Sequence, residues 1–168
     1  NDVRTSLSVA SLGAWHGVNH LAQTSTSNSF WNRSAINVTA ATAAGTQYIF
    51  AIMVRGTAST IGKVARIALY DNISTWVAVS GDITLTADWQ LATVTGTFNV
   101  ASTTRALSLW MGHVAYGGTF PIDDAIHWDA AILVAGATVP QFEEKEVVAT
   151  EAYFANPISA GSPVSGVV

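Results

Sequence analysis

Short segments in which apolar and polar residues alternate run through most of the chain. The clearest is residues 48–55, where Tyr48, Phe50, Ile52 and Val54 share one parity and mostly apolar residues occupy the other. Alternation of this kind, with β-branched and aromatic residues, is typical of β-strands. A strand that is apolar on both faces belongs inside a sandwich. Residues 48–55 are therefore predicted to form a central strand.

Further strands are predicted on either side of this one. Turn residues such as Asp71-Asn72 and Gly117-Gly118 separate them about every 8–12 residues, a spacing that favours an all-β sandwich or barrel. The predicted segments are residues 6–14, 18–26, 36–43, 63–70, 76–79, 89–100, 105–114 and 125–135. Before residue 140 the sequence has no convincing helical period.

The sequence changes character after Phe142. Acidic residues gather there, in an arrangement that suits the first turn of a helix, although residues 147–154 could equally form a strand. The four glutamates of the chain are Glu143, Glu144, Glu146 and Glu151. We predict a sandwich domain over residues 1–142 and a C-terminal linker or arm over residues 143–168, containing a short helix or an exchanged strand.

Composition adds an oddity to this picture. Of the 168 residues, 49% are hydrophobic and only 11% are charged, against about 25% charged in a typical soluble domain. The longest apolar segments, residues 48–54 and 130–139, are much shorter than the roughly 18–20 residues of a membrane-spanning helix. We therefore expect no membrane insertion. The apolar outer faces of residues 48–55 and 126–135 are instead predicted to contact other subunits, most simply in a homo-oligomer that could be a trimer.

Charge and cysteine content exclude several functions. The formal net charge is −4, and the seven basic residues are scattered along the chain. Nucleic-acid binding usually needs a basic patch, so no nucleic-acid partner is expected. The chain has no cysteine, which excludes disulfides, thiolate nucleophiles and cysteine zinc sites.

Four segments resemble a known family when they are taken in order. They are GTQYIFAIMVRG from residue 45, DWQLATVTGTFNV from 88, TRALSLWMG from 104 and HWDAAILVAGATVPQF from 127. Their order and spacing are similar to the strands of carbohydrate-binding modules of families four and nine, with Asp129, Gly136 and Phe142 at the positions of the closing segment. The resemblance covers about 100 residues. It implies a jelly-roll β-sandwich of two antiparallel sheets, often with a structural calcium and a sugar-binding groove.

One departure from the family bears on the outer surface. The closing strand of the family normally carries a Gln/Glu-rich motif, whereas residues 132–136 here read Ile-Leu-Val-Ala-Gly. Endings of this kind resemble those of domains on bacteriophage tail and fibre proteins. The apolar closing strand is consistent with contact to another chain or domain.

Aromatic side chains beside polar ones are the candidates for glycan contact, since a flat ring can cover the apolar face of a sugar while amides and Arg bind its hydroxyls. Trp89 matches a core position of the family, and Trp110 and Trp128 could face either the core or a concave surface. The candidate glycan-binding residues are Trp15, Asn19, Trp31, Asn32, Arg33, Trp76 and Tyr116. The alternative for each aromatic residue is packing at an end of the sandwich or against a partner.

The sequence offers two candidate metal sites. His16 and His20 would share a face on one strand, but the H-E-x-x-H glutamate of a zinc site is missing, so loop packing is the simpler interpretation. Asp129, at the acidic position of the family's closing strand, and Asp123 are candidates for a structural calcium, which takes hard oxygen ligands. The alternative is a turn-forming Asp123 and a hydrogen-bonded Asp129. No other cofactor is expected.

Enzymatic activity is not expected. A glycosidase needs two carboxyl groups that flank the scissile bond, and every glutamate lies outside the predicted sandwich. The nucleophile elbow, P-loop and dinucleotide-binding glycine motifs are all missing.

Two functions remain. The first is a virion structural protein, a phage capsid decoration, fibre or tail component at the extracellular virion surface, with other virion subunits and cell-surface polysaccharide as partners. The second is a carbohydrate-binding module of a secreted glycoside hydrolase. A stable oligomer would favour the first.

Overall fold

The computed structural model describes residues 5–11, 13–28, 32–71, 76–111 and 119–139, and the regular elements in these ranges are all β-strands. The strands are β1 (Thr5–Ser11), β2 (Asn19–Ser25), β3 (Asn32–Thr42), β4 (Gln47–Gly56), β5 (Val64–Tyr70), β6 (Trp76–Val79), β7 (Ile83–Thr84), β8 (Gln90–Thr97), β9 (Ser102–Met111) and β10 (Ala125–Ala135). No helix in the described ranges has the length and apolar character needed to cross a bilayer.

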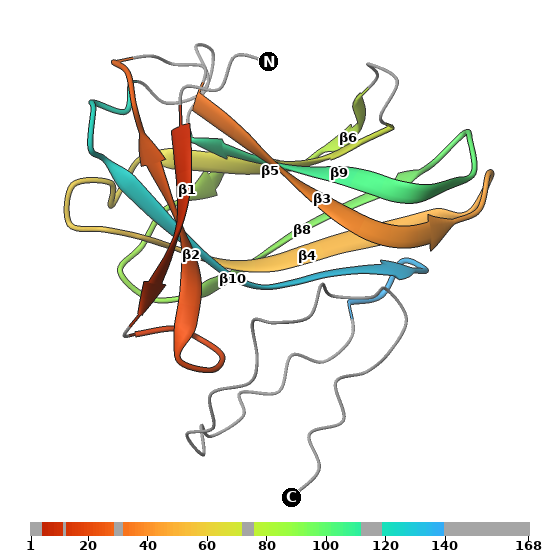
Figure 1. Cartoon of the computed structure of the whole chain (residues 1–168), viewed down its shortest axis with the longest axis horizontal. Helices are drawn as coiled ribbons and strands as arrows, with labels where there is room; N and C mark the ends of the chain where they lie inside the picture. Colours follow the sequence, from red (N-terminus) through yellow and green to blue (C-terminus); the bar gives the residue numbers. More distant parts are fainter. Residues whose placement is uncertain (1–4, 12, 29–31, 72–75, 112–118, 140–168) are drawn as a thin grey trace, which may run out of the picture.

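Two five-stranded antiparallel sheets stack face to face (Figure 1). The first has the order β1-β2-β10-β4-β8, and the second has the order β3-β9-β5-β6 with β7 beside β5. Consecutive strands from β2 to β5 alternate between the sheets, as do β8 to β10, which is the connectivity of a jelly roll. The predicted sandwich is confirmed, and residues 48–55 lie in the central strand β4, between β10 and β8.

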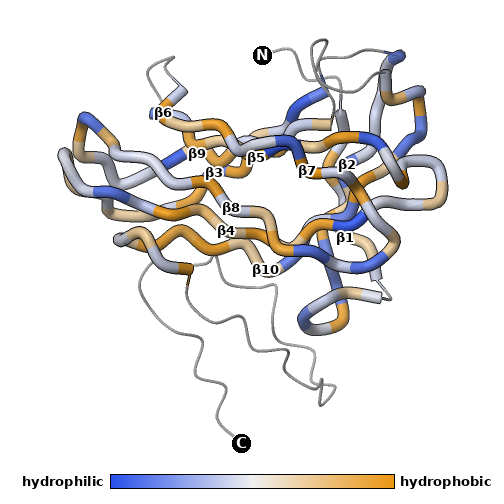
Figure 2. The backbone as a smooth tube through the Cα atoms, turned by 180° about the vertical axis from the view of Figure 1, so that it is seen from behind, coloured by the Kyte–Doolittle hydropathy of each residue, from blue (hydrophilic) through white to orange (hydrophobic). Residues whose placement is uncertain are grey.

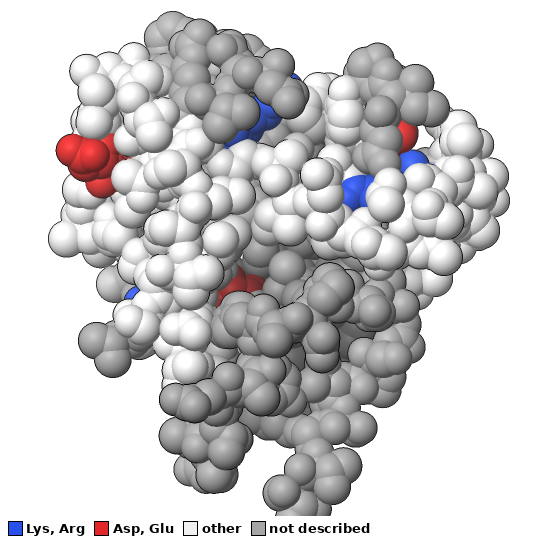
Figure 3. Space-filling model, in the orientation of Figure 1, with Lys and Arg blue, Asp and Glu red and all other residues white. Residues whose placement is uncertain are grey.

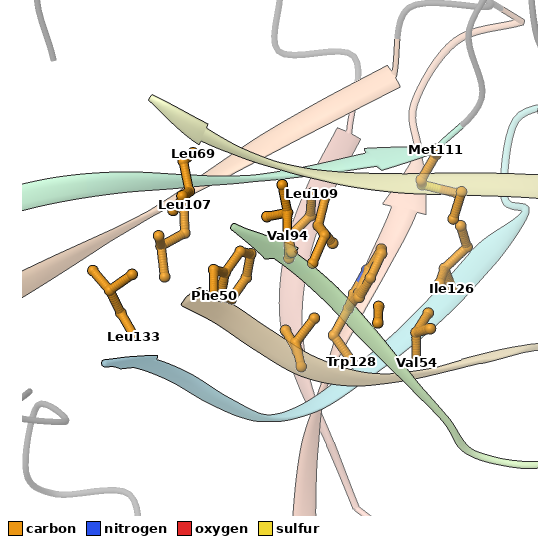
Figure 4. Packing of buried hydrophobic residues seen from close by; sticks show 14 of the residues in the cluster. Phe50, Val54, Leu69, Val94, Leu107, Leu109, Met111, Ile126, Trp128 and Leu133 are labelled. Carbon is orange, nitrogen blue, oxygen red and sulfur yellow. The ribbon is translucent and has the colours of Figure 1, made fainter. Parts of the chain in front are cut away.

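The hydrophobic core lies between the sheets and takes one face of each long strand. Phe50 and Val54 of β4 meet Leu109 of β9 and Trp128 of β10 there, all fully buried (Figure 4). Burying one such side chain contributes about 1.5–3 kcal/mol. Hydrophobic residues concentrate along β4 and β10, and the strongly hydrophilic ones gather towards the loops (Figure 2).

The second face of β4 corrects one prediction. Its side chains Ile49, Ala51 and Met53 point away from the core cluster, yet they are only 3%, 0% and 7% exposed. Ile132 and Val134, opposite them on β10, are half-buried. Because this burial exists within a single chain, this part of the sheet is not the open contact surface that its apolar sequence predicted.

A buried glutamine joins the two sheets at one end of the sandwich. Gln23 of β2 is completely buried, and its Nε2 donates to Ser34 Oγ at 3.2 Å and to the Leu109 carbonyl at 3.1 Å on the other sheet. Its Oε1 accepts a hydrogen bond from Trp128 Nε1 at 2.9 Å. Both polar atoms of the Gln23 side chain are therefore hydrogen-bonded in a site that water does not reach, as buried polar groups require.

At the opposite side of the core, Arg105 of β9 is only 1% exposed. Its Nε donates to Thr42 Oγ1 at 2.7 Å, a further guanidinium nitrogen donates to the Val100 carbonyl, and the guanidinium lies 3.9 Å from the centre of the Phe98 ring. These contacts compensate for the burial of a charge that arginine does not lose.

Several strand boundaries differ from the predictions. β3 begins at Asn32, four residues before the predicted start, because Asn32 and Ser34 point inward and are hydrogen-bonded there instead of being solvated. β9 begins at Ser102, three residues before the predicted start at residue 105. The two-residue β7 was not predicted, since it is too short to alternate visibly. The predicted arm at residues 143–168 lies outside the described residues.

Candidate functional site

The predicted glycan-binding residues fall into two groups on different sheets. Arg33 and Trp76 come together on the outer face of the β3-β9-β5-β6 sheet. Trp15 lies in the β1–β2 loop and Asn19 begins β2, both at the other sheet. Trp31 and Tyr116 lie outside the described residues. The first group thus has two predicted members in direct contact.

Trp76 is the centre of an aromatic cluster with one cation. The Arg33 guanidinium lies 5.1 Å from the centre of its ring, Tyr70 packs at 4.9 Å, and Trp110 meets it edge-on at 5.0 Å between ring centres. Arg33 and Arg66 flank Trp110 on the neighbouring strands β3 and β5. We call these residues the Trp76 cluster.

Strand parity explains why the Trp76 cluster faces outward. On β9, Leu107, Leu109 and Met111 belong to the core, so Trp110 between them must point to the opposite face. Trp76, Tyr70 and Arg33 are each half-buried, which leaves part of every one of these side chains accessible. An aromatic face beside a guanidinium can stack on a sugar ring and donate hydrogen bonds to its hydroxyls.

Asn32 does not belong to this face. Its side chain is 1% exposed, and its Nδ2 donates to Ser25 Oγ at 2.8 Å inside the sandwich. Because Asn32 and Arg33 are consecutive on β3, they must point to opposite faces. Its described environment gives Asn32 a structural role, and a glycan could not reach it.

The β1–β2 loop is tied down on the outer face of the other sheet. Asp129 Oδ2 accepts hydrogen bonds from the backbone N–H groups of Trp15 at 2.8 Å and His16 at 2.9 Å. Asp129 Oδ1 accepts from its neighbour Ala130 at 2.7 Å, and Trp89 Nε1 donates to the Gly13 carbonyl at 3.1 Å. The hydrogen-bonded Asp129 anticipated from the sequence is therefore observed.

Beside this loop lies a second group of polar and aromatic side chains. The Arg55 guanidinium stacks 4.7 Å from the centre of the Trp89 ring. The His20 ring lies 5.8 Å from the same ring and 4.3 Å from the ring of His127. We call Arg55, Trp89, His20 and His127 the Arg55 cluster. Trp89 is half-buried on this outer face, so the expectation of a core tryptophan was wrong, whereas Trp128 lies in the core.

Both histidines of the Arg55 cluster are held in the neutral form. Burial, followed by the charge of Arg55, lowers the pKa of His20 from its ordinary value, and Asp129 opposes this shift. Burial, followed by His20 and then Arg55, lowers the pKa of His127 to about 4. His16 lies in the loop and His20 lies on β2, so these two residues do not share a face of one strand, as the zinc interpretation assumed.

The calcium expectation gains no support in the described ranges. They contain no group of three or more His, Cys, Asp or Glu side chains suited to a metal. Asp129 already accepts three N–H bonds, and exposed Asp123 precedes β10 by two residues, which separates the pair by about 13 Å or more of strand. A calcium site at these aspartates rests on the resemblance alone.

Sequence reasoning did not name six members of the two clusters as site residues, and it considered His20 only for zinc. The six are Tyr70, Trp110, Arg66, Arg55, Trp89 and His127. Parity alone could have found two of them, since Tyr70 and Trp110 alternate with apolar core residues on their strands. Arg55 and Trp89 carry no comparable signal. They meet because of the register in which β4 pairs with β8 and β10. That register cannot be predicted from the sequences of the strands.

Replacing Asp129 by asparagine is expected to lower the free energy of unfolding by about 1–2 kcal/mol, because charge-assisted bonds to two loop amides are weakened. Hydrogen exchange at the amides of Trp15 and His16 should accelerate. Urea denaturation and amide exchange measure the two effects. Exposed Asp88→Asn is the control, expected to stay within about 0.5 kcal/mol of the parent. Unchanged exchange at both amides would contradict the assignment.

Comparison with known proteins shows which solved structures have a similar fold. No protein-family model and no curated protein sequence matches the chain. Among solved structures, a CBM4 carbohydrate-binding module matches with a TM-score of 0.53 and 16% identity over 79% of this chain and 80% of its own. An arabinose-bound α-L-arabinofuranosidase matches with a TM-score of 0.57 and 14% identity over 77% of this chain. Tailspike protein 4 of bacteriophage CBA120 matches with a TM-score of 0.52 and 10% identity over 80% of this chain.

These matches differ in how much of the other protein they cover. The chain spans 22% of the arabinofuranosidase chain and 18% of the tailspike chain, so it is similar to one part of each. At identities this low the similarity concerns the fold. The chain has the β-sandwich fold of carbohydrate-binding modules.

Proposed function

We propose that this chain is a non-enzymatic carbohydrate-binding domain whose glycan site is the Trp76 cluster. The observation that carries the proposal is the contact of Trp76 with Tyr70, Trp110 and Arg33 on one outer face. Trp76 and Tyr70 are partly exposed on this face over the buried Trp110, and exposed aromatic surface of this kind often marks a binding site. The fold of a carbohydrate-binding module supports a sugar as that partner.

The chemistry of the face favours a polysaccharide. Trp76 offers an aromatic surface for the C–H face of a sugar ring, and Arg33 offers several N–H donors to its hydroxyls. Exposed Asn37 lies on the same strand and has the same parity as Arg33, which adds an amide along β3. The carboxylate of Asp82 is held by Arg66, with 2.6 Å between Oδ1 and Nε.

Replacing Trp76 by alanine is expected to weaken glycan binding by about tenfold or more, because stacking on one aromatic side chain contributes on the order of 1–3 kcal/mol by analogy with base stacking. A glycan array identifies the sugar, and calorimetry with the best hit measures the loss. Leu91→Ala, at an exposed position on the other sheet, is the control and should bind as the parent does. Equal affinity of the parent and Trp76→Ala would contradict this site. Trp31, also predicted to contact glycan, can be replaced in the same series.

The biological setting we propose is the surface of a phage particle, as a tail, fibre or capsid-decoration component that other virion subunits hold and that binds cell-surface polysaccharide. The tailspike match supports it. So does the sparse charge over the face seen in Figure 3. Leu7 and Val9 on the edge strand β1 are 39% and 66% exposed, and an unprotected apolar edge suits pairing with another chain.

A module of a secreted glycoside hydrolase is the second candidate, favoured by the arabinofuranosidase match. The two settings differ in assembly. We expect a stable homo-oligomer, such as a trimer, in light scattering at micromolar concentration if the chain is a virion subunit. A monomer under these conditions would favour the enzyme module.

A further inference from the structure

We propose that the Arg55 cluster is a second binding site, on the sheet opposite the Trp76 cluster, and that it takes a carboxylate-bearing sugar such as a uronic acid. Arg55 would receive the carboxylate, and the imidazole of His127 would bind a neighbouring hydroxyl. This site lies beyond the proposed function, which concerns the other sheet.

Arg55 differs from the other arginine and lysine side chains described below in its hydrogen-bond partners. Lys63 and Arg66 each pair with an aspartate, and Arg105 donates to oxygens in the core. Arg55, by contrast, makes no hydrogen bond or ion pair with any residue in the described ranges. Its guanidinium stacks on the Trp89 ring. A guanidinium stacked on a ring is fixed in orientation, and its planar fork of N–H groups matches the two oxygens of a carboxylate.

The two histidines add unpaired groups of another kind. His20 is 2% exposed, and neither of its ring nitrogens has a hydrogen-bond partner; Nδ1 of His127 is likewise buried without one. Buried polar atoms of this sort are costly unless water or a ligand pairs with them. A neutral imidazole has one donor and one acceptor nitrogen, so a hydroxyl group, which both donates and accepts, matches it.

The charges of the cluster discriminate between ligand classes. A metal ion would satisfy the imidazole lone pairs, but Arg55 is close enough to lower the pKa of both histidines, and the same positive charge repels a cation. Asp129 is the nearby carboxylate, and three N–H groups already bind it. A free carboxylate therefore finds a guanidinium without an ion pair, while a hydroxyl group on the same molecule can meet the half-buried imidazole of His127.

The geometry also makes the cluster reachable. Arg55, Trp89 and His127 are half-buried, while His20 lies beneath them. They come from β4, the residue before β8, and β10, with His127 directly opposite Arg55 in the ladder. Trp89 is held by its hydrogen bond to the Gly13 carbonyl. Trp89 acts as a positioning residue for Arg55.

The test uses the intact chain and three small probes in NMR titrations: methyl β-D-glucuronide, methyl β-D-glucoside and acetate. We expect the glucuronide to shift the Trp89 indole and His127 imidazole signals in a saturable way. The glucoside lacks the carboxylate and acetate lacks the hydroxyls. Each should therefore bind at least about tenfold more weakly than the glucuronide. Equal binding of glucuronide and glucoside would overturn the proposal. Acetate binding as tightly as glucuronide would also overturn it, because only an anion would then be recognised.

Matched variants locate the site. Arg55→Gln should abolish the preference for glucuronide over glucoside, whereas Arg33→Gln, at the Trp76 cluster, should retain it. Arg55→Lys keeps the charge without the planar fork and should give an intermediate loss, which keeps the test decisive if Arg55→Gln folds poorly. Trp76→Ala should leave the glucuronide response intact, so failure of the two sites is distinguishable. A glucuronide preference that survives in both Arg55 variants would overturn the assignment.

Discussion

Replacing Trp128 by alanine is expected to lower the free energy of unfolding by about 5 kcal/mol. The side chain is completely buried at the centre of the core (Figure 4), and truncating a buried aromatic residue typically costs about 3–5 kcal/mol. Its loss also leaves Gln23 Oε1 without its donor in a dry site, which adds about 1–3 kcal/mol. Urea denaturation followed by circular dichroism measures the change. Where Trp128→Ala does not fold at all, Trp128→Phe provides the smaller perturbation.

The two contributions to this loss can be separated. Trp128→Phe keeps an aromatic ring but removes the indole N–H, so its cost combines the lost hydrogen bond to Gln23 with a smaller loss of packing. Combining it with Gln23→Leu should cost less than the sum of the single changes, because the two side chains share one contact. Leu91→Ala, at a position that is 45% exposed, is the surface control and should cost less than about 1 kcal/mol. Strictly additive effects in the double variant would contradict the coupling.

The sandwich could be predicted from the sequence because its long strands carry their own periodicity. β4 alternates four core residues with Ile49, Ala51 and Met53, and both sets are buried, as expected for a central strand. β6 and β10 were predicted with their observed boundaries, 76–79 and 125–135. Where a strand has only two residues, as β7 does, there is too little pattern to interpret.

Buried polar residues limited the prediction elsewhere. Asn32 looked like a solvated glycan contact, and its burial depends on Ser25, seven residues away in sequence and on the other sheet. Gln23 likewise finds its partners on β3, β9 and β10. From sequence alone, a polar side chain is predicted to be exposed. Its burial can be predicted only when its hydrogen-bond partners are known, and the tertiary structure supplies them.

The candidate sites show the same limit. Sequence proximity and residue type selected both Arg33 and Trp76, but their contact arises because β3 and β6 border the same outer face on which Trp110 and Tyr70 project. The Arg55 cluster gathers residues from positions 20, 55, 89 and 127. No local motif links these positions, so only the sheet order could bring them together.

Acidification is expected to destabilise the domain through His127 and His20. The pKa of His127 is about 4 in the folded chain, against about 6.5 in an unfolded one. The unfolded state therefore binds more protons between these values, and the stability that is fully present above about pH 6.5 is lost as the pH falls towards 4. Between pH 7 and pH 4.5 we expect His127 to account for a loss of about 2 kcal/mol. The lowered pKa of His20 acts in the same direction.

Urea denaturation of the parent and of His127→Gln at pH 7 and pH 4.5 tests this expectation. Carboxylates titrate in the same range, so the comparison between variants carries the result. His127→Gln should lose about 2 kcal/mol less on acidification than the parent, whereas Leu91→Ala should follow the parent at both pH values. An NMR titration of the His127 imidazole checks the cause directly. Two outcomes would contradict the expectation: a titration midpoint near pH 6.5, or parallel pH profiles for the parent and His127→Gln. Either would show that His127, whose ring lies 4.3 Å from that of His20, is protonated as readily in the folded chain as in the unfolded one.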